Sequence, residues 1–377
     1  MSDVLMFDSR GTFASLNSDL IDRHRIYIRS AKQESNGRIE RLVVITNGAF
    51  NGQVLLLDED ILILGFRVRN LFKTFFTSRP ALENQIKPLV ISCSDPWSSF
   101  WLAKVFTWRK FLGADLKRVP IQIQLHSDVF SKNWRKANLK ATFKIFVLPI
   151  VLQEATQIRC MSRSMADELR LKCPGIKSEI VWAPVPILLP EKPSQLRNEI
   201  PRTIGFVGRI HPERGLSEFV HFANVIHEIA PDIKFVIVGS GKYERKFKQD
   251  LIKSIPSEQI EFLGELDQKQ MEFAWRQIGI LVSTAPSESY GRTLREALVR
   301  GIAIWSTQTR GFTDLIEESN SPHVAEIRDF SSKAALEADL NSLLGKSSDL
   351  TYYESYSELR DKAIKDIGVF WAGLAEL

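Results

Sequence analysis

Two glutamates, Glu288 and Glu296, stand in one short stretch of the chain with seven residues between them. The apolar run 280–284 before them predicts a buried strand, and the apolar positions of 293–300 predict a helix. Since the chain must turn between strand and helix, the backbone N–H groups of residues 290–292 can face a ligand. Free amides at a helix start suit a phosphate, and carboxylates accept hydrogen bonds from sugar hydroxyls. This chemistry fits a nucleotide sugar.

Two arginines lie upstream of the glutamates, in a segment that predicts a loop after a strand. Arg209 and Arg214 stand five residues apart within residues 206–215. A leaving nucleotide diphosphate gains negative charge as its glycosidic bond breaks, and the planar guanidinium fork matches phosphate oxygens. Gly239 and Gly241 end another predicted strand, where a backbone without Cβ atoms can approach a ligand closely. These residues predict a diphosphate site.

A regular alternation of strand and helix patterns in the second half of the chain supplies the frame for these residues. It begins after five prolines that cluster between Trp182 and Thr203, a composition typical of an interdomain linker. Such alternation predicts a doubly wound parallel sheet, which binds ligands beyond the carboxyl ends of its strands. The predicted strands are 203–207, 233–238, 259–263, 279–284, 302–306 and about 323–327; the predicted helices are 215–230, 242–254, 267–276, 292–300, 312–318, 332–344 and one or two within 352–377.

Weaker signals lie in the first half of the chain. Residues 4–7 predict a strand that leads into Arg10 and Gly11, and residues 121–125 predict one that leads into His126. By themselves Arg10 and Gly11 indicate an ordinary turn, and a lone histidine is more often structural than functional. Other short runs of strand type are 26–28, 42–45, 54–57 and 88–92.

Residues 101–144 are unusually basic. Ten lysines and arginines stand there against two acidic residues, Asp115 and Asp128, and aromatic residues interleave with them. One interpretation is a solvated face over core aromatics; the other is a surface that meets an anionic membrane or an anionic acceptor. We predict no nucleic-acid partner, because no recognition motif accompanies the charge.

Composition bounds the class of protein. A chain of 377 residues with 44% hydrophobic and 25% charged residues predicts a globular protein of two domains. The three cysteines, Cys93, Cys160 and Cys173, form no pair of metal or redox type, which favours a reducing compartment. No leader and no apolar run of membrane-spanning length is evident, so we expect a cytoplasmic protein, peripheral on the inner face of the membrane if the basic stretch docks there. The six histidines are scattered, which predicts no metal site.

Taken together, these motifs resemble the signature of family 4 retaining glycosyltransferases of the GT-B fold. The resemblance is dense over residues 203–318 and thinner before them. It departs from the family where Arg214 replaces a lysine and where Ser289 follows the first glutamate. It departs again downstream, where Arg310-Gly311-Phe-Thr-Asp314 stands in place of the family's paired glycines and glutamate. The stretches that carry it are 206–215, 235–241, 260–264 and 285–298, in the family's order.

The resemblance implies an α/β fold of GT-B type: two Rossmann-like doubly wound domains facing a cleft, with a C-terminal helix that crosses back to the first domain. The implied boundaries are 1–186 for an acceptor-binding domain, 187–202 for a linker, 203–350 for a nucleotide-sugar-binding domain and 351–377 for the crossover helices.

It also implies a metal-independent hexosyltransferase that moves a sugar from a nucleotide-diphosphate sugar to a glycan or lipid-linked acceptor, with no cofactor besides that donor substrate. A small soluble acceptor, an inactive nucleotide-sugar-binding protein and a GT-B epimerase remain alternatives. The implied catalytic residues are His126, Glu288, Arg209 and Arg214. The implied donor-binding residues are Gly208, Arg209, Arg214, Gly239, Gly241, Glu288, Ser289, Tyr290, Gly291 and Glu296, and Arg10 and Gly11 form the implied acceptor or phosphate loop.

Overall fold

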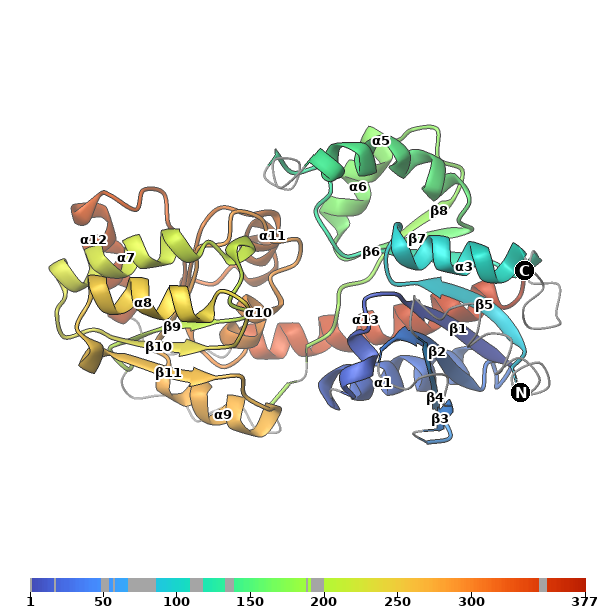
Figure 1. The fold of residues 1–377 in the computed structure, drawn as a ribbon, viewed down its shortest axis with the longest axis horizontal. Coiled ribbons are helices and arrows are strands. Elements are labelled where there is room, and N and C mark those ends of the chain that lie inside the picture. The colour runs from blue at the N-terminus through green and yellow to red at the C-terminus, as the bar shows by residue number, and fades with distance from the viewer. Residues whose placement is uncertain are drawn as a thin grey trace. The chain divides into compact units, whose positions relative to one another are not determined.

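A computed structural model divides the chain into two compact units (Figure 1). Unit 1 comprises Met1–Pro186 and Arg360–Leu377, and unit 2 comprises Ile187–Leu359. Most of the predicted linker and parts of the basic stretch (109–117 and 133–138) lie outside the described residues. The structure describes residues 2–16, 18–48, 54–56, 58–66, 86–108, 118–132, 139–187, 189–190, 200–345 and 351–377.

Unit 1 is built on a sheet that has eight strands in the described residues, in the order β3-β4-β2-β1-β5-β6-β7-β8. Neighbours run parallel except β3, which is antiparallel to β4. All six residues of β1 are buried, as expected of a parallel strand that is covered on both faces. The strands are β1 Asp3–Asp8, β2 Arg41–Asn47, β3 Val54–Leu56, β4 Ile61–Phe66, β5 Pro88–Cys93, β6 Ile121–Leu125, β7 Gln157–Cys160 and β8 Glu179–Trp182.

Helices cover this sheet, and one of them corrects a predicted strand. Residues 26–28 lie inside α1, not in a strand. Ile21, Ile28 and Ala31 recur at helical spacing and are all buried in the unit 1 core, so packing of one helix face outweighs the local strand preference. The helices of unit 1 are η1 Thr12–Ser15, α1 Ser18–Glu34, α3 Ser98–Trp108, α5 Leu139–Gln153 and α6 Arg163–Lys172.

Unit 2 has a parallel sheet of six described strands in the order β11-β10-β9-β12-β13-β14. The chain builds outward from β9 in one direction and then restarts at β12 in the other. The carboxyl ends of β9 and β12 therefore flank a topological switch point, where open α/β sheets bind ligands. The strands are β9 Thr203–Val207, β10 Lys234–Val238, β11 Ile260–Gly264, β12 Ile280–Ser283, β13 Ala303–Ser306 and β14 Val324–Glu326.

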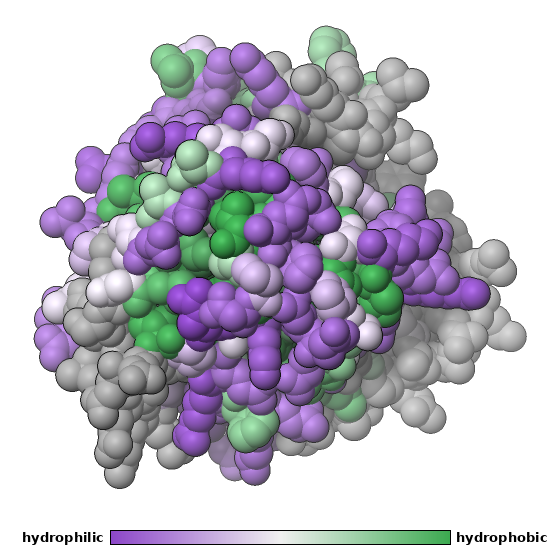
Figure 2. All heavy atoms as spheres, turned by 90° about the vertical axis from the view of Figure 1, so that its left-hand side faces the viewer, coloured by the Kyte–Doolittle hydropathy of each residue, from purple (hydrophilic) through white to green (hydrophobic). Residues whose placement is uncertain are grey.

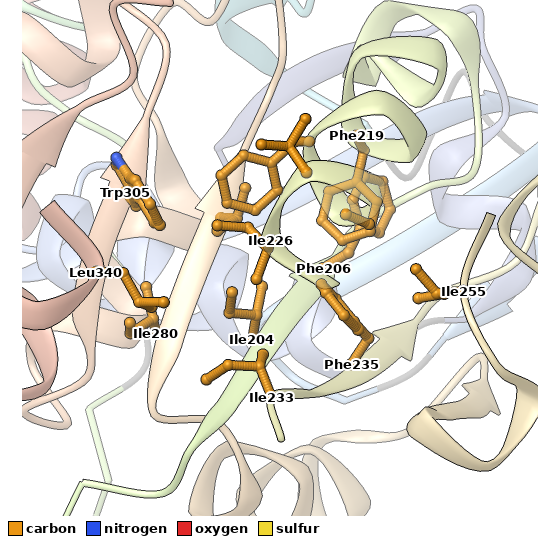
Figure 3. Packing of buried hydrophobic residues seen from close by; sticks show 14 of the residues in the cluster. Ile204, Phe206, Phe219, Ile226, Ile233, Phe235, Ile255, Ile280, Trp305 and Leu340 are labelled. Atoms are coloured by element: carbon orange, nitrogen blue, oxygen red, sulfur yellow. The ribbon is translucent and has the colours of Figure 1, made fainter. Parts of the chain in front are cut away.

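An aromatic core holds this sheet to its helices (Figure 3). Phe206 of β9 packs against Phe219 of α7 with ring centroids 5.1 Å apart, and Phe222 packs edge-on against Trp305 of β13 at 5.0 Å. Such aromatic pairs stabilise the fold by about 0.5–1.5 kcal/mol each beyond the effect of their buried area. This packing fixes the strands whose ends carry the candidate site. The helices are η4 Pro212–Arg214, α7 Leu216–Ile229, α8 Glu244–Ser254, η5 Ser257–Gln259, α9 Gln268–Gln277, α10 Arg292–Leu298, α11 Arg310–Ser319 and α12 Lys333–Leu344; each predicted strand and helix of this half is confirmed within about two residues.

The last helix, α13 (Thr351–Leu374), contributes to the cores of both units (Figure 1). Tyr352 and Tyr356 pack in a core of unit 2, whereas Ile367 and Trp371 pack in the core of unit 1. The indole Nε1 of Trp371 donates a hydrogen bond to Gln122 Oε1 at 3.0 Å. The prediction of a C-terminal helix that returns to the first domain is confirmed.

Candidate active site

The switch point of unit 2 brings the arginine loop and the glutamate loop together. β9 and β12 are neighbouring strands, and each of these loops follows one of them. Arg214 donates a hydrogen bond from Nη1 to the carboxylate of Glu288, 74 residues along the chain. Thr284 Oγ1 donates to the Gly215 carbonyl at 2.8 Å and so ties the two loops directly. Arg214 and Glu288 also line a cavity of about 20 Å³, room for about one water molecule.

The glycines at this edge allow close backbone approach. Gly239, with φ +129°, follows β10, and a Cβ there would lie 2.0 Å from the Gly208 carbonyl oxygen. A Cβ on Gly241 would lie 2.3 Å from the Ile210 carbonyl oxygen. Gly208 itself, at φ +149°, lies against Arg214, whose Nε would be 3.8 Å from an added Cβ. The structure thus requires glycine at 239 and 241 because two backbone segments pack closely there. The sequence analysis had instead explained these glycines by close approach to a ligand.

Arg209 stands at the open side of the arginine loop. Its Nη2 donates to Glu213 at 3.0 Å, and the two side chains are 65% and 66% exposed. His211 Nδ1 also lies 3.3 Å from the Glu213 carboxylate. An exposed pair of this kind is held weakly, by about 0–1 kcal/mol, so a phosphate can take the place of Glu213.

A buried arginine that sequence reasoning missed supports the glutamate loop. Arg295 of α10 is fully buried; its Nη2 lies 2.8 Å from the carboxylate of Glu318, and its Nη1 donates to the Tyr290 carbonyl. Its guanidinium carbon lies 3.9 Å from the centroid of the Tyr290 ring. The Tyr290 side chain is itself buried, which raises the pKa of its phenol. Only the backbone of Tyr290 is therefore placed to serve a ligand. Arg295, next to Glu296 in the chain, gave no signal in the sequence, because charged residues on a helix are usually solvated.

Gly311 at the start of α11 completes this support. A Cβ there would lie 2.6 Å from the Tyr290 carbonyl carbon and 2.7 Å from the Gly291 nitrogen, while Gly311 N–H donates to the Glu288 carbonyl at 2.8 Å. Gly291, at φ +69°, is the N-cap of α10. Ser289 lies half-buried between these residues. Gly311, within the Arg310–Asp314 stretch that departs from the family pattern, thus holds the loop backbone by close contact.

Glu296 lies on α10 and pairs with a different arginine from the one that pairs with Glu288. Arg292 Nε lies 2.8 Å from the Glu296 carboxylate, a pair four residues apart on one helix face. Each of the two glutamates therefore has its own arginine, Arg214 for Glu288 and Arg292 for Glu296.

His126 and Arg10 belong to unit 1, where both line a cavity of about 320 Å³. His126 Nε2 lies 3.0 Å from Gln124 Oε1, which assigns the ring proton to Nε2, and Gln124 Nε2 donates to Ser92 Oγ at 2.9 Å. The ring is exposed toward the cavity, yet surrounding protein and then the charges of nearby arginines lower the pKa of His126 to about 3. His126 is therefore neutral near pH 7. Gly11 does not line this cavity; it has φ +76° and its added Cβ would meet the Asn47 carbonyl oxygen at 2.0 Å.

Within the described residues, no three His, Cys, Asp or Glu side chains gather into a group that could hold a metal ion. An Asp-x-Asp triplet at residues 58–60, a spacing that sequence reasoning overlooked, is engaged otherwise: Asp58 accepts from Arg25 Nε and Asp60 from Arg29 Nε, both at 2.7 Å. Among the helices that the structure describes, none combines the length and apolar character that a bilayer crossing requires.

Comparison with known proteins finds sequence similarity to glycosyltransferases. Residues 190–366 match the family model of Glycosyl transferases group 1. A 2-deoxystreptamine N-acetyl-D-glucosaminyltransferase of Niallia circulans is 26% identical over 124 residues, 32% of either chain. A GDP-mannose-dependent alpha-mannosyltransferase of Mycolicibacterium smegmatis is 24% identical over 143 residues, 38% of this chain and 35% of that protein. The matched segments span about a third of the length of these relatives.

Among solved structures, HepE of Anabaena in complex with UDP and glucose is similar with a TM-score of 0.65 at 14% identity, and the match covers 100% of both chains. This likeness, together with the two parallel-sheet units, confirms the predicted GT-B fold.

Proposed function

We propose that this protein is a metal-independent retaining glycosyltransferase of family 4, which transfers a hexose from a nucleotide-diphosphate sugar to a glycan or lipid-linked acceptor. The contact between Arg214 and Glu288 at the switch point of unit 2 is the observation that carries the proposal. A guanidinium that can bind phosphate lies there beside a carboxylate that can accept hydrogen bonds from a sugar. The match of residues 190–366 to Glycosyl transferases group 1 supports it. HepE, named as a complex with UDP and glucose, supports a nucleotide sugar as donor.

The diphosphate would lie against Arg209 and Arg214. Without a donor, Glu213 and Glu288 neutralise these arginines, so binding exchanges each carboxylate for phosphate oxygens. Arginine suits this exchange because its fork accepts either anion in the same geometry. As the glycosidic bond breaks, charge builds on the leaving phosphate, and both guanidiniums stabilise it.

The two glutamates would divide the rest of the donor between them. Glu288, released from Arg214, would accept hydrogen bonds from the transferred sugar, and Glu296 on α10 would accept them from the ribose hydroxyls. Backbone groups at Ser289, Tyr290 and Gly291 would approach sugar and phosphate, because Arg295 and Gly311 hold that backbone in place.

Transfer would proceed on one face of the sugar, with the leaving phosphate accepting the proton of the acceptor hydroxyl. A histidine with a pKa of about 3 is a weak base, so His126 would orient the acceptor rather than take its proton. A small soluble acceptor is the second candidate, since the cavity of about 320 Å³ in unit 1 is in the size range of small-molecule sites, about 300–1,000 Å³.

Nucleotide binding tests the proposal. Among UDP, GDP and ADP, the nucleotide with the correct base should stabilise the fold by about 2.7 kcal/mol at 100 times its Kd, seen as a rise in melting temperature. Arg209→Ala should weaken binding of that nucleotide by about 1.5–3 kcal/mol, the contribution of a charge-assisted hydrogen bond. Arg328→Ala, which removes a charge from an 85% exposed side chain of unit 2, is the matched control. Equal affinity of the parent and Arg209→Ala in calorimetry would contradict the phosphate assignment.

Turnover should not require a divalent ion, because guanidinium groups supply the positive charge that neutralises the leaving diphosphate. Once the donor is known, we expect equal initial rates with and without excess EDTA in metal-free buffer. A loss of rate that Mg²⁺ or Mn²⁺ restores would show that the charge neutralisation is assigned to the wrong groups.

The protein would be cytoplasmic and would reach a lipid-linked acceptor at the inner face of an anionic membrane. The residues coloured in Figure 2 are mostly hydrophilic. α5 in unit 1 differs: Phe143, Phe146 and Ile150, spaced on one helix face, are 68%, 77% and 61% exposed. Lys104 and Lys144 lie in the same basic stretch. An apolar helix face with a lysine on the same helix, Lys144, suits insertion into an anionic bilayer surface.

Membrane contact is tested by removing that apolar face. Phe146→Ser with Ile150→Ser should weaken binding to phosphatidylglycerol vesicles by about tenfold or more, since burying each such side chain contributes about 1.5–3 kcal/mol. Binding should also fall with added salt and with neutral phosphatidylcholine. Phe273→Ser, at a 66% exposed position of α9 in unit 2, serves as the control. If the parent binds neutral and anionic vesicles equally, residues 101–144 are only a solvated face.

A further inference from the structure

The cavity of unit 1 is lined by charged side chains to which the proposed function assigns no role. Its volume is about 320 Å³, and its wall includes three arginines, Arg10, Arg23 and Arg159. They come from three separate places in the chain: the loop after β1, helix α1 and strand β7. Three guanidiniums around one small space indicate recognition of negative charge.

Arg159 is the buried member of this set. It is 2% exposed, and its Nε and Nη2 donate to the Ala183 carbonyl at 3.2 and 3.1 Å. Nη2 also donates to the Pro184 carbonyl at 3.1 Å, and the guanidinium lies 5.9 Å from the centroid of the Tyr27 ring. These partners are neutral, so they satisfy its hydrogen bonds without cancelling its charge. A buried charge in this state favours an anion nearby.

Two acidic side chains, Asp8 and Asp95, also lie on the described cavity wall, so that three positive charges stand there against two negative ones. Asp8 accepts from Phe13 N–H at 2.9 Å and from Thr46 Oγ1 at 2.7 Å. Asp95 accepts from Trp97 N–H at 2.8 Å and from Ser99 Oγ at 2.9 Å. Arg10 lies 3.9 Å from Asp95, beyond hydrogen-bond distance, and remains 63% exposed.

Two histidines on the wall add no charge near pH 7. His24 Nδ1 lies 2.8 Å from the Leu20 carbonyl oxygen and so carries the ring proton. Burial, followed by repulsion from Arg23 and Arg159, lowers the pKa of His24 to about 3. The same arginines, with Arg10, also lower the pKa of His126 after desolvation. Both rings are therefore neutral near pH 7 and add nothing to the positive charge of the three arginines.

We propose that the acceptor carries a phosphate group, which the unit 1 cavity binds through Arg10 and Arg23 while Arg159 supplies a fixed positive charge beneath it. This inference rests on the proposed function, since it names the acceptor class of the same enzyme. Arg23, with an 11% exposed side chain, is 3.4 Å from Asp19 and is held in place by that contact. Arg10 is exposed and closes on the phosphate from the loop after β1.

Glycerol 3-phosphate is the probe and glycerol its neutral counterpart. Calorimetry of the full chain without donor should show binding of glycerol 3-phosphate and none of glycerol at the same concentrations. Arg10→Gln and Arg23→Gln should each weaken that binding about tenfold or more. Arg29→Gln removes the same charge from α1, at a 64% exposed side chain paired with Asp60 and outside the cavity wall, and should leave binding unchanged.

Dihexanoyl phosphatidate, a short lipid with the same phosphate monoester, distinguishes two sources of the group. Tighter binding of this lipid than of glycerol 3-phosphate assigns the phosphate to a lipid headgroup, and the reverse order assigns it to a soluble phosphorylated acceptor. Under either assignment, Arg10→Gln and Arg23→Gln must weaken binding of the phosphate probe. Equal weak binding of glycerol and glycerol 3-phosphate, or equal loss in Arg29→Gln, would overturn the inference.

UDP binding is measured on the same samples to separate this inference from the proposed function. The cavity residues lie in unit 1 and the donor residues in unit 2, so Arg10→Gln and Arg23→Gln should keep the parent's affinity for UDP or the preferred nucleotide. Nucleotide binding without phosphate-probe binding would reject the acceptor class alone. Probe binding that requires Arg10 and Arg23, in a protein that binds no nucleotide, would reject the proposed transferase and leave an anion-binding cavity.

Discussion

Replacing Glu288 with glutamine is expected to lower sugar transfer about 100-fold, which corresponds to ~2.7 kcal/mol in the barrier, while affinity for the bare nucleotide diphosphate stays equal or rises. The amide keeps the shape of the side chain but loses the charged acceptor that would contact the sugar. It also releases Arg214 from its ion pair, which leaves that guanidinium open to phosphate. A loss confined to turnover would place Glu288 at the transferred sugar.

The matched variant Glu296→Gln should show the opposite pattern. Its proposed partner is the ribose, so affinity for the bare nucleotide should fall by about 1.5–3 kcal/mol, the range for a hydrogen bond to a charged group. Arg292, four residues away, would lose its partner in this variant. Losing one ion pair between residues four apart on a helix changes stability by only about 0.3–0.5 kcal/mol, so the fold should persist.

Calorimetry with the nucleotide and initial transfer rates with the full donor measure both variants. Glu213→Gln is the control: it also frees an arginine, Arg209, but its side chain is 66% exposed and has no proposed contact with sugar. Transfer by this control should remain near the parent rate. If Glu288→Gln loses the nucleotide and Glu296→Gln keeps it, the two roles are reversed. If both variants keep binding and turnover, the glutamates act only on stability.

Replacing Arg295 with methionine is expected to destabilise the protein by about 3–5 kcal/mol, the range for removing one partner of a buried ion pair. The Arg295 side chain is fully buried, and its loss leaves the partly buried carboxylate of Glu318 without the guanidinium. The Tyr290 carbonyl also loses its donor. For a domain of this size, such a change lowers the melting temperature by about 10 °C.

Thermal unfolding followed by circular dichroism measures this effect, with two further variants as controls. Arg276→Met, at an exposed position of α9, should change the melting temperature little. Adding Glu318→Leu to Arg295→Met should recover part of the loss, because a buried pair replaced by apolar groups is often close to neutral. A melting temperature of Arg295→Met equal to that of the parent would show that the glutamate loop does not depend on this pair.

The sequence by itself determined the frame of unit 2. Long alternating patterns between residues 203 and 344 predicted each strand and helix closely, because hydrophobic periodicity over whole elements is a strong local signal. Arg209, Arg214, Glu288 and Glu296 were singled out because their residue types match the chemistry of a nucleotide sugar. The sequence did not show which arginine pairs with which carboxylate.

Local signals were weaker in the first half of the chain. The β-branched run at 26–28 predicted a strand, yet the buried face of α1 decided for a helix, since packing against the sheet outweighs a preference shared by three residues. His126 was correctly placed at the end of a strand. The lowering of its pKa was not predictable, because it follows first from burial and then from arginines that the fold brings in from distant segments.

Only the tertiary structure decided how the site is held together. The ion pair between Arg214 and Glu288 joins loops 74 residues apart, and it exists because β9 and β12 are neighbours at the point where the sheet reverses its order. Arg295 looked like a solvated helix residue until folding buried it beneath the Tyr290 backbone. Residue type and spacing determined which chemistry was available, whereas long-range packing, which no local pattern encodes, determined which charges meet and which are buried.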